Sequence, residues 1–254
     1  MRYLCLFLLM FNINQATHAG LVASSTRMIY QPESRERTLM LANTNDYPVV
    51  VQTWVDNGDV DSTPDQAEAP FMVLPAVFKM QSGSAQAQRI INKGDNLPAD
   101  RESVYWLNLY EIPPKTPRNA EAHAQLAMAM NTQMKIFHRP KGLTPEPDEA
   151  MKKVSFTLQK QNKEYVLTVH NPTPYHVSFG QMQLNSAQQK HTIAQQMNMM
   201  ITPFAVRQYQ FEHPPTSLNG KLTLEYVYFD DAGKHVVEVM GNAAGQLADR
   251  FHFL

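Results

Sequence analysis

Apolar residues recur at every second position along much of the chain, which is the spacing that places side chains on one face of a β-strand. The pattern covers residues 49–55, 154–158, 165–169 and 222–228. Short runs of this kind, bounded by proline, asparagine, aspartate and glycine, predict antiparallel strands of β-sandwiches. Residues 187–200 also fit a helical period, so the sequence leaves strand and helix open there.

A stretch without apolar alternation divides the chain. Residues 142–149 carry two prolines among several acids, a composition typical of a linker. We therefore predict an N-terminal immunoglobulin-like domain over residues 20–141, a linker over residues 142–150 and a C-terminal β-sandwich domain over residues 151–254. Each part has the size of an immunoglobulin-like sandwich, so the expected fold class is all-β, with two such domains in tandem.

The first residues follow the order of a secretory signal peptide. Arg2 precedes the apolar run from Leu4 to Phe11, and a small residue, Ala19, ends the polar segment that follows. The competing interpretation is an N-terminal strand or anchor, but the apolar run is too short to span a membrane. Cleavage after Ala19 leaves Gly20 as the first residue and removes Cys5, the only cysteine. We expect the mature chain to fold without disulfides in an oxidising compartment.

Charge and composition argue against several classes of protein. The 22 basic and 23 acidic residues give a net charge of −1, so there is no polybasic surface for nucleic acid. No apolar run reaches the roughly 18 residues of a membrane-spanning helix. There is no nucleophile elbow, glycine-rich phosphate loop or H-E-x-x-H motif. We therefore predict no enzyme, cofactor or metal site, although a hydrolase with dispersed catalytic residues would show no motif.

One segment carries a more specific signal. Residues 97–114 read LPADRESVYWLNLYEIPP, which closely resembles the signature of the periplasmic pilus-assembly chaperones, the PapD-like family. Residues 41–54, 134–140 and 171–175 resemble further parts of that family, in the same order. The resemblance implies two sandwiches in a boomerang arrangement that bind a pilus or fimbrial subunit whose own sandwich lacks a strand. It also implies a periplasmic location and an outer-membrane usher as partner, and it leaves open a self-capping homodimer of the free protein.

The resemblance assigns a donor strand to residues 125–132, which read QLAMAMNT. Leu126, Met128 and Met130 fall on one face of such a strand and have the offset from residues 134–140 that the family's donor residues have. From alternation alone, the same three side chains fit the core of their own domain equally well. Their burial in a subunit would contribute about 1.5–3 kcal/mol each before opposing costs.

The resemblance also assigns roles to charged residues. Arg27 and Lys135 match a pair of cations that binds the terminal carboxylate of the subunit in the cleft between the domains. Taken singly, each would be an ordinary solvated surface residue. An interdomain salt-bridge network is implied for a second group of residues, namely Arg89, Glu102 and Asp231, with Asp230 as an alternative acid and Arg139 as a basic position without an assigned role.

Two departures from the family pattern concern loops. Pro75 occupies a position that is cis in relatives, but Ala76 replaces the second proline that the family usually has there. The interval from Pro114 to Lys135 is somewhat longer than in the short-loop relatives. It lacks the cysteine pair and long insertion of the other subgroup, so the chain resembles the short-loop subgroup, which serves rod-like pili. The competing hypothesis is a secreted sandwich that is itself a fimbrial subunit or adhesin. Residues 20–24 are too short for the N-terminal extension of such a subunit, and the usual cysteine pair is missing.

Overall fold

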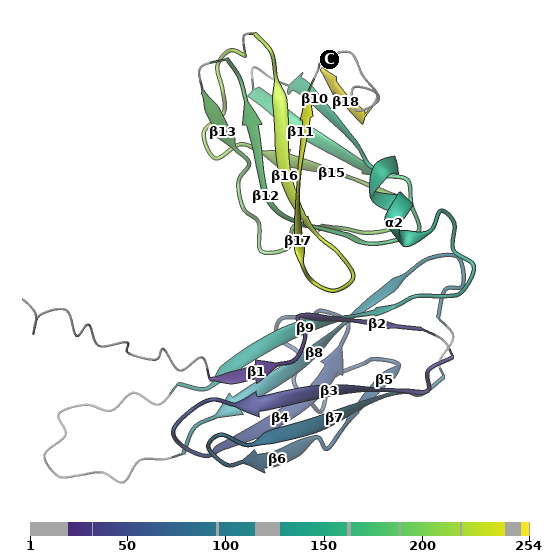
Figure 1. Cartoon of the computed structure of the whole chain (residues 1–254), viewed down its shortest axis with the longest axis vertical. Helices are drawn as coiled ribbons and strands as arrows, with labels where there is room; N and C mark the ends of the chain where they lie inside the picture. The colour runs from purple at the N-terminus through teal and green to yellow at the C-terminus, as the bar shows by residue number, and fades with distance from the viewer. Residues whose placement is uncertain are drawn as a thin grey trace, which may run out of the picture.

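The structure, a computed structural model, describes residues 20–31, 33–94, 97–114, 128–161, 164–187, 189–218, 220–241 and 250–253. Their regular structure is almost entirely β, arranged in two sandwiches (Figure 1). None of the helices in these ranges is long and apolar enough to cross a bilayer. The predicted fold class, two β-sandwich domains in tandem, is confirmed.

The first sandwich packs a sheet of order β1-β3-β7-β5 on a sheet of order β2-β9-β8-β4-β6. Its strands are β1 (Leu21–Ala23), β2 (Arg27–Tyr30), β3 (Glu36–Asn43), β4 (Val49–Asp56), β5 (Phe71–Leu74), β6 (Val77–Met80), β7 (Ala85–Asn92), β8 (Ser103–Ile112) and β9 (Met130–His138). Val49, Val51, Thr53 and Val55 are all buried, as their alternation predicts, and the three valines belong to one apolar core fed by both sheets. The period of two therefore identified the inward face of β4 correctly.

The second sandwich packs a sheet of order β15-β11-β10-β18 on one of order β13-β12-β16-β17, with β14 also paired to β12. Its strands are β10 (Ser155–Gln161), β11 (Glu164–Asn171), β12 (Val177–Asn185), β13 (Lys190–Thr192), β14 (Met200–Ile201), β15 (Ala205–Gln210), β16 (Thr223–Phe229), β17 (His235–Gly241) and β18 (Phe251–Phe253). A separate apolar core fills it. The described residues between 187 and 200 contain β13 and the start of β14 but no helix, which decides the alternative that the sequence left open.

The connection between the sandwiches is more ordered than a plain linker. It contains the short helix α2 (Pro147–Ala150) and a 3-10 turn over Met151–Lys153. Leu143 and Ala150 are buried in a small apolar cluster with Tyr175, whose hydroxyl donates a hydrogen bond to the carbonyl of Leu143 at 3.3 Å. These contacts attach the connection to the second sandwich, so the chain passes from one domain to the other close to the end of β9.

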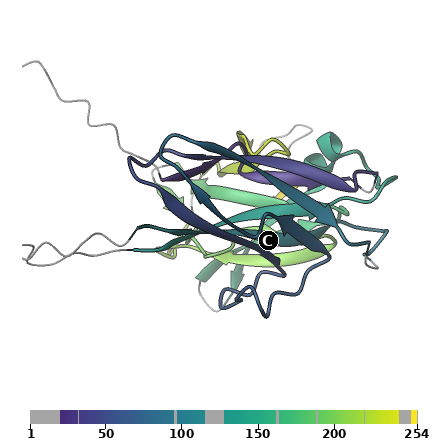
Figure 2. The same cartoon turned by 90° about the horizontal axis from the view of Figure 1, so that it is seen from below.

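The two sandwiches meet at an angle, and the hairpin loop between β16 and β17 reaches toward β2 and β9 (Figure 1). In the view from below, the purple-to-blue strands of the first sandwich lie in front of the green strands of the second (Figure 2). Gly233 in the hairpin loop has a φ of +78°, and a Cβ atom there would lie 2.2 Å from Oγ1 of Thr26. Only glycine therefore allows this close approach between the domains.

Candidate functional site: the cleft between the sandwiches

Arg27 and Lys135 lie side by side. The parallel strands β2 and β9 pair in a register that makes these two residues direct partners. Both line a cavity of about 400 Å³ whose opposite wall comes from the second sandwich. An Nη atom of Arg27 donates a weak hydrogen bond of 3.4 Å to the carbonyl of Phe229, and its guanidinium lies 5.4 Å from the Phe229 ring. The two cations proposed from the sequence thus share one cleft.

The cleft is electrostatically unsatisfied. Burial lowers the pKa of Lys135, and the positive charge of Arg27 lowers it further. Burial also lowers the pKa of Arg27, while Asp231, Asp230 and Glu102 act in the opposite direction. None of the ion pairs among the described residues includes Arg27 or Lys135. Two partly desolvated cations without a bound acid form a site that favours an anion.

The wall from the second sandwich contains residues that the sequence did not identify. Residues 195–200, QQMNMM, line the cavity, and Met197 is 97% exposed there. Met199 and Met200 are buried and attach this loop to its own domain, helped by a hydrogen bond of 3.2 Å from the Tyr209 hydroxyl to the carbonyl of Met199. The loop therefore presents an apolar side chain beside the two cations. The sequence indicated only that residues 187–200 fit a helical period as well as a strand, which did not point to a binding cleft.

The predicted donor segment leads into β9. Leu126 lies outside the described residues, whereas Met128 is 70% and Met130 is 47% exposed. Neither methionine fills the core of its own domain, in contrast to Met134 and Ile136, which continue the same face of the strand and are buried. The alternative that these side chains belong to their own core is therefore wrong for Met128 and Met130.

Among the residues that the structure describes, one edge of β9 has no strand partner over its first half. β9 pairs with β8 along its whole length, from Met130 opposite Glu111 to His138 opposite Ser103. On its other side it pairs with β2 only from Lys135 to His138. Within the described residues, the backbone of residues 130–134 thus has an open edge that ends at the cation pair. Such an edge accepts an added strand.

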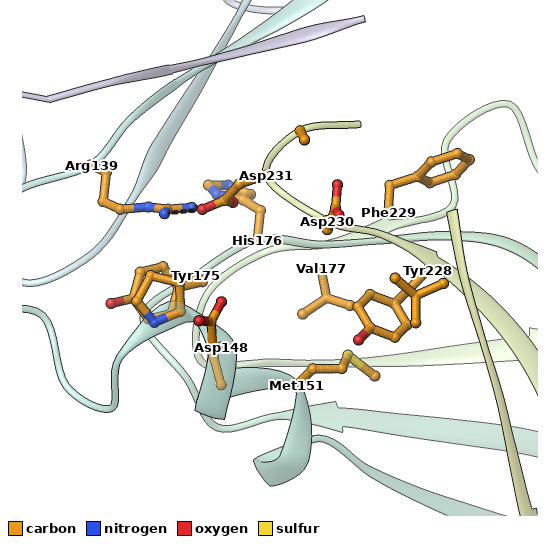
Figure 3. Close-up of a pocket in the computed structure, with 14 residues that line it drawn as sticks. Arg139, Asp148, Met151, Tyr175, His176, Val177, Tyr228, Phe229, Asp230 and Asp231 are labelled. Atoms are coloured by element: carbon orange, nitrogen blue, oxygen red, sulfur yellow. Dashed lines mark hydrogen bonds and ion pairs between the residues drawn. The ribbon is translucent and has the colours of Figure 1, made fainter. Parts of the chain in front are cut away.

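Arg139 joins the two domains. Its Nε donates to Oε1 of Glu102 at 2.7 Å, and an Nη atom donates to Oδ1 of Asp231 at 2.7 Å. Figure 3 shows the Arg139 side chain pointing at Asp231 in the hairpin loop after β16. The other oxygen of Glu102 accepts hydrogen bonds from the backbone N–H of His176 at 2.8 Å and, at 3.2 Å, from its Nδ1 when that nitrogen carries the proton. With its side chain only 1% exposed, Glu102 is a buried carboxylate held by groups of both domains.

The assignment of Arg89 to this network is wrong. Arg89 lies on β7 and forms an exposed, bidentate ion pair with Glu36 of the neighbouring strand β3, at 2.7 and 2.5 Å. Arg139 occupies the central position instead, and Glu102 and Asp231 both contact it. The pKa of Arg139 is raised, because its contacts with Asp231 and Glu102 outweigh the opposing effect of burial.

The peptide bond between Leu74 and Pro75 is cis, as the resemblance implied. The turn is tied to β4, because the backbone N–H of Thr53 donates to the carbonyl of Ala76 at 2.7 Å. Ala76, which stands where the family usually has a second proline, thus accepts a hydrogen bond from the sheet through its backbone carbonyl.

Two sandwiches bridged by a partly buried ion-pair network, with an open strand edge that enters a cationic cleft, are the arrangement expected of a two-domain assembly chaperone. Residues 20–144 match the family model "Pili and flagellar-assembly chaperone, PapD N-terminal domain", and residues 149–239 match "Pili assembly chaperone PapD, C-terminal domain". The chain belongs to the PapD-like family of pilus-assembly chaperones.

Named relatives agree with this assignment. The chain is 32% identical to the probable fimbrial chaperone YadV of Escherichia coli K12 over 227 residues, which cover 89% of each protein. It is 38% identical to the chaperone protein FimB/FhaD of Bordetella pertussis over 174 residues, covering 66% of this chain and 69% of that protein. The crystal structure of the YadV chaperone superposes with a TM-score of 0.72 at 28% identity, covering 87% of this chain and 98% of that one.

Proposed function

We propose that this protein captures pilus subunits in the periplasm by donating strand β9 and its preceding segment to their incomplete sandwich. The captured subunits then pass to an outer-membrane usher. The observation that carries the proposal is the free edge of β9, which runs directly into the Arg27–Lys135 pair. A subunit that lacks a strand offers the complement, which is an unpaired backbone edge, an apolar groove and a chain end with a carboxylate.

The donated strand would supply both hydrogen bonds and apolar contacts. The open backbone edge of residues 130–134 pairs with the subunit, and Met128 and Met130 enter its groove. Burying a methionine side chain fully contributes about 1.5–3 kcal/mol. The flexible, unbranched side chain suits grooves of differing shape. Leu126 would be the third apolar contact.

The cation pair would fix the register of the complex. A terminal carboxylate bound by Arg27 and Lys135 compensates two charges that burial now disfavours. It also sets which donor side chain meets which pocket, because a slip of one residue turns the opposite face of the strand inward.

The remaining parts of the proposal rest on the family and the sequence. YadV is named a probable fimbrial chaperone, which supports fimbrial subunits as partners here. Export would use the signal peptide expected at residues 1–19, which lie outside the described residues. No enzymatic step or cofactor is required, because binding, capping and release are exchanges of strand pairing. The alternative role as a fimbrial subunit or adhesin has no support from the relatives named above.

Co-purification of subunits tests the proposal. Arg27→Gln and Lys135→Met should each reduce the recovery of pilus subunits from periplasmic extract at least tenfold, because a buried charge-assisted contact is lost. Lys79→Met is the matched control, since Lys79 is an exposed cation on the distant strand β6. Circular dichroism checks that each variant is folded. Unchanged recovery with folded Arg27 and Lys135 variants would refute the carboxylate anchor.

A further inference from the structure

Glu111 is a buried carboxylate that the proposed function does not use. It lies on β8 with 6% of its surface exposed. Its Oε2 accepts a hydrogen bond from the backbone N–H of Leu21 at 3.0 Å, and its Oε1 accepts one from the side-chain amide of Asn45 at 2.8 Å. Both donors are neutral, and none of the ion pairs among the described residues includes Glu111. A carboxylate this deep normally has a cationic partner.

Gly20 is held against this carboxylate. Its carbonyl accepts hydrogen bonds from the backbone N–H of Thr44 at 3.0 Å and from the Thr44 hydroxyl at 2.6 Å. A Cβ atom at Gly20 would lie 3.2 Å from Oε2 of Glu111 and 3.4 Å from Cε of Met130. The residue is itself buried and has a φ of +76°. The α-nitrogen and this Cβ position are both attached to Cα of Gly20, so the α-nitrogen lies two bonds from a point that is 3.2 Å from Oε2 of Glu111.

We infer that Glu111 and Asn45 form a binding site for an ammonium group, and that its occupant is the chain's own α-amino group at Gly20. The inference rests on the proposed export, because the group exists only after cleavage. Hydrolysis of the Ala19–Gly20 peptide bond consumes one water, leaves a carboxylate on Ala19 and frees an amine at Gly20 that takes up a proton. A neutral amide next to Glu111 thereby becomes a cation, and a charge-assisted hydrogen bond replaces an unpaired buried charge.

The site lies at the start of the donor edge. Glu111 and Met130 are register partners in the pairing of β8 with β9, so the ammonium would be fixed beside the first residue of β9. Removal of the signal peptide would then stabilise the strand from which the donor segment leaves the sandwich. Processing and readiness for subunit capture become linked through one ion pair.

The test compares two forms of the mature chain that differ by one residue, one beginning at Gly20 and one retaining Ala19. Both have a terminal ammonium, but Ala19 makes the Gly20 nitrogen an amide again and moves the charge away. Chemical unfolding should show an unfolding equilibrium constant at least tenfold smaller for the Gly20 form. The same pair of forms carrying Glu111→Gln should not differ, whereas Glu164→Gln, an exposed acid at the start of β11, should keep the full difference.

The inference is overturned if the Gly20 and Ala19 forms of the wild-type chain have equal unfolding equilibrium constants. It is also overturned if the two forms differ by the same factor when both carry Glu111→Gln. If Glu111→Gln does not fold, the pKa of the Gly20 α-amine, measured by NMR in the wild-type protein, decides. An ion pair raises it above the ordinary value near 8, and a value at or below about 8 overturns the inference. N-terminal sequencing of the exported protein distinguishes a failure of the ammonium site from a failure of the proposed export. A first residue other than Gly20 refutes the cleavage position, while the pocket is still tested by the prepared Gly20 form.

Discussion

Replacing Arg139 should destabilise the protein far more than replacing Arg89. Arg139→Gln removes the cation from Glu102, whose side chain is 1% exposed. Removing one partner of a buried pair costs about 3–5 kcal/mol. Glu102 keeps its two hydrogen bonds from His176, and the ion pair with the half-exposed Asp231 contributes little to stability. We therefore expect Arg139→Gln to lower the free energy of unfolding by about 2–3 kcal/mol.

The two tryptophans make the measurement domain-specific. Trp54 on β4 and Trp106 on β8 are the only tryptophans of the chain, and both lie in the first sandwich with Glu102. Urea unfolding followed by tryptophan fluorescence therefore measures the unfolding of the domain that contains Glu102, whose carboxylate has lost its cationic partner in Arg139→Gln. With a slope of about 2–3 kcal/mol per molar urea, the midpoint should fall by about 1 M.

Two companion variants make the result interpretable. Arg89→Gln removes the exposed pair with Glu36 and should leave the midpoint unchanged within error. Adding Glu102→Gln to Arg139→Gln should recover more than half of the loss, since no uncompensated charge then remains. Equal effects of Arg89→Gln and Arg139→Gln, or a change below about 0.5 kcal/mol for Arg139→Gln, would refute the assignment of Arg139 as the bridge.

Three further predictions concern the cleft and the donor segment. Lys135→Met should raise the thermal midpoint of the free protein while it abolishes subunit capture, because burial and Arg27 lower the pKa of Lys135; an unchanged or lower midpoint in calorimetry would contradict this. Because the pKa of Lys135 is lower in the folded protein than in the unfolded chain, the charged form destabilises the folded protein at pH values below the folded pKa. The free energy of unfolding should therefore rise as the pH increases from the folded pKa toward the ordinary pKa of lysine. Carboxylate binding should be lost over the same rise, and Lys135→Arg should move that loss to higher pH in titrations of peptide binding. Met128→Asp combined with Met130→Asp should weaken capture without unfolding the protein, whereas Met72→Asp, at an exposed methionine on β5, should not affect capture; precipitation of the double variant would mean that these methionines are part of the fold.

Local periodicity predicted the strands well, because one buried face forces an alternation that needs no knowledge of the partner strand. The inward set of β4 is an example, since Val49, Val51 and Val55 are all buried. Family resemblance located Arg27 and Lys135, which the strand register then placed together. The salt-bridge network was harder, because either Arg89 or Arg139 supplies the same charge and only the three-dimensional path decides which one reaches Glu102.

Two other features had no sequence signal that pointed to a functional site. Met197 belongs to the cleft because Met199 and Met200 anchor its loop to the second core, which depends on long-range packing. Glu111 is unusual only because Gly20 and Asn45 come to it from distant positions in the chain. Within its own strand, Glu111 is one polar residue among alternating apolar ones.

The hairpin loop after β16 connects the bridge to the anchor. Phe229 accepts the hydrogen bond from Arg27, Asp231 accepts those from Arg139, and Gly233 packs on Thr26. These three contacts fall within five consecutive residues, so the groups that set the angle between the domains also hold the guanidinium in the cleft. A change in the angle between the domains would move the loop and separate the carbonyl and ring of Phe229 from Arg27. The Arg27 guanidinium would then lose its position in the cleft. Loss of Arg139 is therefore expected to weaken subunit capture as well as stability, although Arg139 does not line the cavity with Arg27 and Lys135.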